Sequence, residues 1–373
     1  MPAYARKEIV EEDRVGVYHC VARCVRRAFL CGQDPVSGRS FEHRKEWVRK
    51  KLEQLAAIFA IDIGGYAAMS NHLHVVLRLR PDVLLGWSDE EIARRWWRLF
   101  PWRRDKDGRP AEPEEHELAM LVADPKVAAE RRRRLGSLSW LMRCLCEPIA
   151  RRANREDQCT GRFWEGRFKC QALLDDAAVL ACSVYVDLNP IRAAVVQTPE
   201  ESQYTSAFDR IQSRQAEEQL ARTPKGGTRP GRRVARLASQ AARAGWLSPI
   251  RAECAAVQAS GKRSPRKPGF EKAERIRRAS SESFLPISLE QYLSILDWTG
   301  RQLRRLKRGA IPGHLASILD RLGIASEQWV ESVTHFGRLF HRAAGRAEHL
   351  LERASAAGRR WFQGLAPARL AFQ

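Results

Sequence analysis

The chain has 373 residues, of which 65 are lysine or arginine and 44 are aspartate or glutamate, and its formal net charge is +21. This length allows two or three domains, each with its own core, and excludes a small single module. The charge suits a polyanionic partner, either a nucleic acid or an anionic membrane surface. Residues 1–14 do not resemble a signal peptide, and no apolar run of about 18 residues is present, so we expect a cytoplasmic protein without a membrane span.

The nine cysteines are scattered without a CxxC pair, which is not the pattern of a disulfide framework. We therefore expect most of them to be buried thiols. A zinc site formed by Cys20, Cys24 and Cys31 stays open as an alternative, although their spacing is not the usual one for zinc ligands.

The first 80 residues predict the order strand, helix, strand, strand. Residues 14–25 are apolar and rich in β-branched side chains, as in a strand. Residues 41–60 carry large apolar side chains at helical spacing. Residues 61–69 predict a second strand interrupted by two glycines, and Ser70-Asn71 is a typical turn before a third strand.

The third strand begins with His72-Leu73-His74. Side chains alternate between the two faces of a strand, so both imidazoles lie on one face, whereas Leu73, Val75 and Leu77 face a core. Two imidazoles on one strand face can bind a metal ion. The alternative is a half-exposed strand that carries two histidines by chance.

Residues 81–135 predict a helical insertion, with a helix start at Ser88 and a polar, turn-rich segment at 101–113. Within it, the four arginines at 131–134 form either a solvated helix face or a contact with a phosphate backbone. Residues 138–152 then predict another amphipathic helix.

Residues 161–173 mix aromatic and basic side chains. Arg162, Trp164, Arg167 and Lys169 have the chemistry to stack on bases and to bind phosphates. The alternative is ordinary sheet packing by the aromatic side chains of this segment.

Residues 177–189 predict a helix that is capped by Asp175-Asp176 and limited by Pro190. On this helix Tyr185 and Asn189 share a face, because they lie four residues apart. A phenol that attacks phosphorus needs a metal ion or a positive field, and a neighbouring amide oxygen can complete a metal shell with two histidines. A buried tyrosine followed by a helix-capping asparagine is the alternative.

Three blocks together resemble a known family. Met-Ser-Asn-His-Leu-His-Val-Val-Leu at 69–77, Phe-Trp-Glu-Gly-Arg-Phe-Lys at 163–169 and Tyr-Val-Asp-Leu-Asn-Pro-Ile-Arg-Ala at 185–193 resemble the signature blocks of the REP-associated tyrosine transposases. These belong to the single-tyrosine HUH transposases of insertion sequences. The resemblance covers about residues 10–200, and the long stretch 81–135 and everything beyond about 205 depart from it.

The resemblance implies an α+β fold, namely a ferredoxin-like domain with a central antiparallel sheet and helices on it. It implies a divalent metal, Mg²⁺ or Mn²⁺, held by His72, His74 and Asn189, and a nucleophilic Tyr185. The expected partner is single-stranded or hairpin DNA, bound by a monomer or a dimer. With the basic and aromatic segment described above, the expected DNA contacts are Arg162, Trp164, Arg167, Lys169 and Arg192.

The remainder of the chain predicts two further regions. Residues 206–283 read as a basic flexible linker: the part from 222 to 283 holds sixteen lysine or arginine residues and four glutamates, and several Gly and Pro residues interrupt it. Residues 284–373 predict a helical accessory domain. Its basic segment 301–308 either lies in a DNA groove or forms the outer face of a helix.

The sequence thus predicts a HUH nuclease domain at 10–205 that cleaves and rejoins single-stranded DNA through a 5′-phosphotyrosine link. One alternative is a non-catalytic nucleic-acid-binding regulator. A nearer alternative is a replication initiator or relaxase, because these nucleases share the two-histidine site.

Overall fold

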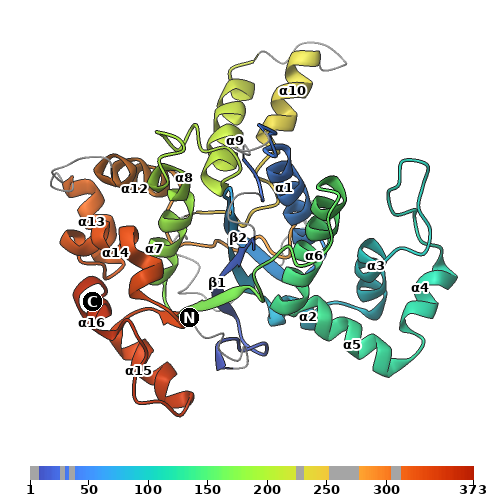
Figure 1. Ribbon diagram of the computed structural model, residues 1–373, viewed down its shortest axis with the longest axis horizontal. Helices are drawn as coiled ribbons and strands as arrows, with labels where there is room; N and C mark the ends of the chain where they lie inside the picture. The colour runs from blue at the N-terminus through green and yellow to red at the C-terminus, as the bar shows by residue number, and fades with distance from the viewer. Residues whose placement is uncertain (1–7, 26–29, 33–37, 224–230, 252–276, 304–311) are drawn as a thin grey trace.

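The structure is a computed structural model, and it describes residues 8–25, 30–32, 38–223, 231–251, 277–303 and 312–373. It has an α+β fold in which one mixed sheet lies between two groups of helices (Figure 1). The strands are β1 (Gly16–Arg23), β2 (Ile61–Ala68), β3 (His72–Leu79), β4 (Lys169–Leu173) and β5 (Ala343–Ala344). The helices up to the last of the sheet domain are α1 (His43–Ala56), α2 (Pro81–Leu85), α3 (Asp89–Leu99), α4 (Glu115–Val122), α5 (Pro125–Leu135), α6 (Leu138–Glu156), α7 (Asp176–Asp187) and α8 (Asn189–Arg192). The later helices are α9 (Ser206–Ala221), α10 (Arg232–Ala241), α12 (Leu289–Leu303), α13 (Gly313–Arg321), η3 (Ser326–Gln328), α14 (Trp329–Leu339), α15 (Ala347–Ala356) and α16 (Leu365–Ala371).

The described strands are ordered β2-β3-β1-β4-β5. The first four pair antiparallel in the order of a ferredoxin-like sheet, which confirms the predicted fold class. The short strand β5 differs from the prediction, because it pairs parallel to β4 and comes from the C-terminal region. Its two residues give no strand pattern that a sequence could show.

The two faces of the sheet are covered by different helices. Helices α1 and α6 contact each other on one side, and α7 lies on the other (Figure 1). Leu73, Val75 and Leu77 of β3 are fully buried, as their alternation predicts. Helix α7 begins where expected, because the Asp175 carboxylate accepts a hydrogen bond from the backbone N–H of Ala178.

The predicted insertion at 81–135 folds into α2 to α5, and Ser88 caps α3 as expected. Its arginine run is largely engaged in contacts within the protein. Arg132 donates to the backbone carbonyls of α2 and the loop after it, while Arg133 and Arg134 both pair with Glu130. These contacts favour the solvated helix face over a phosphate site.

The segment predicted as a flexible linker is partly folded. Its first 16 residues form α9, which packs beside α10 and touches β2. On α9 the buried Asp209 accepts hydrogen bonds from Arg49, at 3.0 Å, and from the Tyr66 hydroxyl, at 2.9 Å. Polar groups that bond into the core therefore hold this part of the predicted linker in place. Residues 224–230 and 252–276 of the predicted linker lie outside the described residues.

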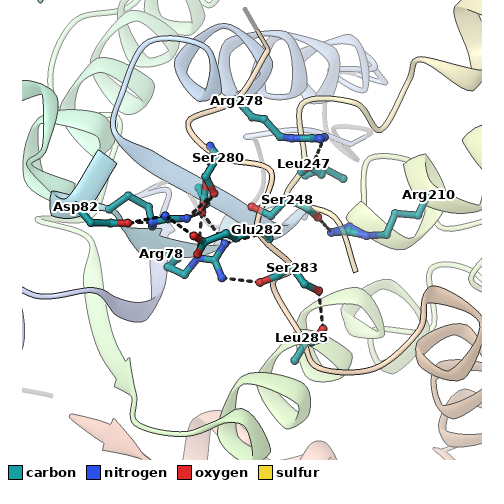
Figure 2. A network of polar contacts seen from close by, with 12 residues as sticks. Arg78, Asp82, Arg210, Leu247, Ser248, Arg278, Ser280, Glu282, Ser283 and Leu285 are labelled. Carbon is teal, nitrogen blue, oxygen red and sulfur yellow. Dashed lines mark hydrogen bonds and ion pairs between the residues drawn. The ribbon is translucent and has the colours of Figure 1, made fainter. Parts of the chain in front are cut away.

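Residues 277–285 pack against side chains of β2 and β3 (Figure 2). Arg78 donates to the Ser283 carbonyl at 2.7 Å and to the buried Asp62 carboxylate, which also accepts from the Ser280 hydroxyl. The ring of Phe284 fills the space over Gly64, where a β-carbon would lie only 2.1 Å from it. This segment therefore covers one face of β2 and β3, the face on which Asp62 and Arg78 pair.

The C-terminal region shares its core with the sheet domain. Buried apolar residues of α12 and α14 belong to the same continuous cluster as those of β3 and α7. The buried Asp187 carboxylate at the end of α7 accepts from Ser206 of α9 and from the Tyr292 hydroxyl of α12. Residues 284–373 are thus packed onto the sheet domain, whereas residues 304–308 of the basic segment fall outside the described part. No helix among the described residues is long and apolar enough to cross a membrane.

Candidate active site

A cavity of about 770 Å³ opens on the face of the sheet that α7 covers. Strands β1, β3 and β4 form its floor, while α7 and α14 contribute its walls. The polar side chains that line it include His72, His74, Gln171, Tyr185, Arg192 and Arg338. The cavity therefore joins the three sequence blocks at 69–77, 163–169 and 185–193 with the C-terminal region.

Strand register explains how the imidazoles meet. Val21 pairs with His74 and Arg23 with His72, so the side chains at 19, 21 and 23 share the face of the two histidines. The ring centroids of His72 and His74 lie 4.7 Å apart. The ring of His19 stacks on His74 with a centroid distance of 5.1 Å and an interplanar angle of 9°. Three histidines thus form one cluster on the cavity floor.

These imidazoles are held neutral. Burial lowers the pKa of His72 to about 4, and the positive charges of Arg23 and Arg192 act in the same direction. Burial also lowers the pKa of His19 to about 4 and that of His74 well below its usual value. A neutral imidazole keeps a lone pair, which is the form that binds a metal ion.

Tyr185 of α7 faces the histidine cluster. Its ring centroid lies 5.7 Å from that of His74, in an edge arrangement. The guanidinium carbon of Arg192 lies 4.5 Å from the centroid of the tyrosine ring, so a positive charge stands beside the phenol. On its other side the phenol contacts α14, where Phe336 and Gly337 lie.

Asn189 does not join this group. Its side-chain nitrogen donates to the Tyr185 backbone carbonyl at 3.1 Å, it is buried, and it is not among the residues that line the cavity. The same four-residue spacing that predicts a shared face also allows this local bond to the backbone. Its role as a metal ligand stays a prediction.

The predicted DNA contacts separate into two groups. Arg167, Lys169 and Arg192 line the cavity. Arg162 is exposed outside the lining. The Trp164 indole N–H donates to the Cys146 carbonyl at 2.9 Å, so that ring is held by packing, in line with the alternative for this segment.

Sequence reasoning missed several cavity residues. His19 and Gln171 come from β1 and β4, and His335, Arg338 and His341 come from α14 and the turn after it. The only available signal was a histidine within the apolar first strand, but its partners depend on strand register. Nothing local to the C-terminal segment indicates that it reaches this cavity.

The residues of the cluster suit a divalent metal in part. The Nε2 atom of His74, a residue of the cavity lining, is buried and has no hydrogen-bond partner, as expected of a ligand atom. Within the described ranges no group of three or more His, Cys, Asp or Glu side chains is arranged to hold a metal, and this includes the cysteines at 20, 24 and 31. A metal here would take two imidazoles and complete its shell with other oxygens, as Mg²⁺ does with water and phosphate.

No protein-family model and no curated protein matches the sequence. Among solved structures, the chain is similar to one described as "Structure of the REP associates tyrosine transposase bound to a REP hairpin". The identity is 13% and the TM-score 0.33, over 62% of this chain and 96% of that chain. A likeness this remote assigns neither residues nor an activity.

Proposed function

We propose that this protein is a metal-dependent endonuclease and transposase that cleaves and rejoins single-stranded DNA through Tyr185. The observation that carries the proposal is the convergence of Tyr185 with His72 and His74 in one cavity, with ring centroids of Tyr185 and His74 5.7 Å apart. A nucleophile beside neutral imidazoles and fixed cations is the arrangement that phosphoryl transfer needs.

The reaction is a transesterification. The Tyr185 oxygen attacks phosphorus, the bond between phosphorus and the 3′ oxygen breaks, and the phenol proton ends on the departing 3′ hydroxyl. The 5′ end remains bound to the protein as a phosphotyrosine. Because the phosphodiester energy is kept in this link, a 3′ hydroxyl of another strand can reverse the step, and no external energy source is required.

The chain's own residues bind and orient the strand. Arg192 is beside the phenol, and Arg167 and Lys169 stand on the rim of the same cavity, where they can bind phosphates on either side of the scissile bond. His72 and His74 would hold Mg²⁺ or Mn²⁺, with Asn189 as the predicted further ligand. A metal held there would polarise the phosphate and stabilise the charge that develops on it.

The size of the cavity favours single-stranded DNA. About 770 Å³ is the volume of a site for one drug-sized ligand, so it accommodates one or two nucleotides and not an intact duplex. The hairpin or strand on either side would lie against the basic surface around the opening. The net charge of +21 supports such binding without sequence readout.

The proposal is tested with end-labelled hairpin-flanked single strands, Mn²⁺ and the full-length protein on denaturing gels. We expect a slow band, the covalent adduct, that Tyr185→Phe eliminates while DNA binding persists. Tyr204→Phe is the matched control, because Tyr204 lies outside the cavity lining. An adduct that survives Tyr185→Phe would assign the nucleophile elsewhere, and binding without any cleavage by the wild-type protein would favour the non-catalytic regulator.

A further inference from the structure

Three buried polar side chains form a row across three neighbouring strands: His74 on β3, His19 on β1 and Gln171 on β4. The His19 Nε2 and His74 Nδ1 atoms lie 2.8 Å apart, which is hydrogen-bond distance. Gln171 is the direct cross-strand partner of His19, so their side chains project side by side on the same face. All three are at most 6% exposed, so water does not compete for these bonds.

The direction of the row is set by the Nε2 atom of His74, which is buried and has no hydrogen-bond partner, so a proton there would be an unsatisfied donor. Gln171 lies beside His19, and a side-chain hydrogen bond with it opposes the lowering of the His19 pKa by burial, as expected for an imidazole N–H that points to the amide oxygen. The amide nitrogen of Gln171 has no hydrogen-bond partner, in agreement with this assignment. The His19 proton then lies on Nδ1, because the Nε2 atom faces His74.

A neutral imidazole carries one ring proton, so a His19 protonated on Nδ1 has a lone pair on Nε2. That lone pair can only accept, and the hydrogen bond at 2.8 Å then requires the proton on Nδ1 of His74. The other ring atom of His74, Nε2, is the buried atom without a partner. It is left with a lone pair, and His74 lines the cavity.

We propose that His19 and Gln171 are positioning residues that hold His74 in the Nδ1–H tautomer, with the Nε2 lone pair available to a metal ion. The inference rests on the proposed function for the metal itself, whereas the tautomer is a property of the metal-free protein. Metal-binding histidines are commonly oriented by a bond from their second ring nitrogen. In this chain His19 on β1 supplies that bond to His74, and Gln171 on β4 lies beside His19.

The opposite direction of the His19–His74 hydrogen bond would leave a buried donor unsatisfied. If His19 donated from Nε2, the proton of His74 would lie on its Nε2, as a buried N–H without an acceptor. His19 Nδ1 would then need a donor, and the amide nitrogen of Gln171 does not contact it. Both directions leave the amide nitrogen of Gln171 without a partner, but only the opposite direction adds a buried Nε2–H of His74 without an acceptor.

The first measurement is the tautomer of His74 in the metal-free, full-length protein labelled with ¹⁵N-histidine. The His74 signals are assigned by their loss in His74→Ala. We expect the shifts of an Nδ1–H imidazole in the wild type and in His19→Gln, whose amide oxygen replaces the accepting Nε2. His19→Ala and Gln171→Leu should give a mixture of tautomers, and a wild-type Nε2–H imidazole would overturn the proposal.

The second measurement is Mn²⁺ affinity, followed by titration calorimetry. We expect His19→Ala to weaken it by about 10- to 100-fold, the usual effect of removing such a partner, and His19→Gln to restore most of it. If His19→Ala does not fold, the comparison of His19→Gln with Gln171→Leu decides, because only Gln171→Leu loses an acceptor. Equal affinity in both variants would overturn the proposal.

The two proposals fail differently. If His74→Ala abolishes Mn²⁺ binding while Gln171→Leu has no effect on tautomer or affinity, the positioning role is wrong and the metal site stands. If His74→Ala binds Mn²⁺ like the wild type, the metal assignment in the proposed function is wrong. The ¹⁵N spectrum of the metal-free protein still decides the tautomer in that case.

Discussion

Gly337 of α14 lies directly against the Tyr185 hydroxyl: a β-carbon at Gly337 would lie 3.0 Å from that oxygen and 3.6 Å from the ring carbon that bears it. The C-terminal region thus touches the proposed nucleophile. A second link joins α14 with α8, because Arg192 donates to the Thr334 carbonyl at 2.6 Å. The C-terminal helices are therefore part of the candidate active site, and a change in α14 should alter the chemistry at Tyr185.

Gly337→Ala tests this contact. The added methyl group must displace the phenol by a few tenths of an ångström or more, and misplacement of a reacting group by 1 Å can cost about 100-fold in rate. We expect slower formation of the covalent adduct in single-turnover gels, with the protein still folded. Stability should change little, because alanine gains roughly 0.5–1 kcal/mol over glycine in a helix, and this offsets part of the crowding.

The matched control is Gly313→Ala, at the start of α13 in the same region, where a β-carbon meets nothing within 4 Å. It should leave the rate of adduct formation unchanged. Equal rates in wild type, Gly337→Ala and Gly313→Ala would show that α14 does not constrain the phenol.

Two arginines that the sequence groups together should behave differently. Arg192 lines the cavity and stands over the Tyr185 ring, whereas Arg162 is exposed outside the lining. We expect Arg192→Ala to slow cleavage at saturating DNA, because a cation beside the reacting phosphate is lost. Arg162→Ala should at most weaken binding and its salt dependence. The check is cleavage rate and affinity for both variants, and a similar loss of rate in the two would remove the distinction.

Much of the fold is readable from local patterns. The alternation at 72–79, the helical spacing at 41–60 and the caps at Ser88 and Asp175 each depend on residues close in sequence. The structure has these elements near the predicted bounds, with the helix at 43–56. The approach of Tyr185 to the two histidines followed from three sequence blocks taken together.

The remaining features depend on contacts between distant segments. His19 joins the cluster through the register of β1 with β3 and β4, which no single strand reveals. Helix α9 was missed because 206–221 was grouped with the basic segment 222–283, although it has no positive excess itself, and buried polar bonds such as that between Asp209 and Arg49 hold it in place. The contact of Gly337 with Tyr185 has no local signal at all.

The C-terminal region packs onto the sheet domain, so a change at their contact should lower the free energy of unfolding of the whole chain. Tyr292 of α12 donates to the buried carboxylate of Asp187, so Tyr292→Phe removes one hydrogen bond from a group that water cannot reach. We expect a loss of about 1–3 kcal/mol in the free energy of unfolding, measured by urea titration. Tyr204→Phe, at a partly exposed tyrosine, is the control and should change it by less than about 0.5 kcal/mol. If residues 284–373 unfolded as an independent domain, Tyr292→Phe would shift only a separate unfolding transition and leave that of the sheet domain unchanged.

The lowered pKa values of the histidine cluster predict how stability depends on pH. In the folded chain the pKa of His19 and that of His72 are about 4, whereas the unfolded chain has values near 6.5. Between pH 4 and pH 6.5 the unfolded chain binds more protons than the folded chain. The contribution of the neutral histidines to the free energy of unfolding is therefore complete above pH 6.5 and is lost as the pH falls towards 4. At pH 5 the loss is up to about 2 kcal/mol for each histidine.

Urea unfolding at pH 7 and pH 5 measures this loss, and His19→Gln should reduce it because one titrating group is removed. The exposed His116 is the control, since His116→Gln leaves the cluster intact. Burial raises the pKa of Asp187, so protonation of this carboxylate favours the folded chain as the pH falls. Asp187 is present in both variants, so its effect cancels in the comparison. If wild type and His19→Gln lose equal stability between pH 7 and pH 5, the folded protein does not keep His19 neutral.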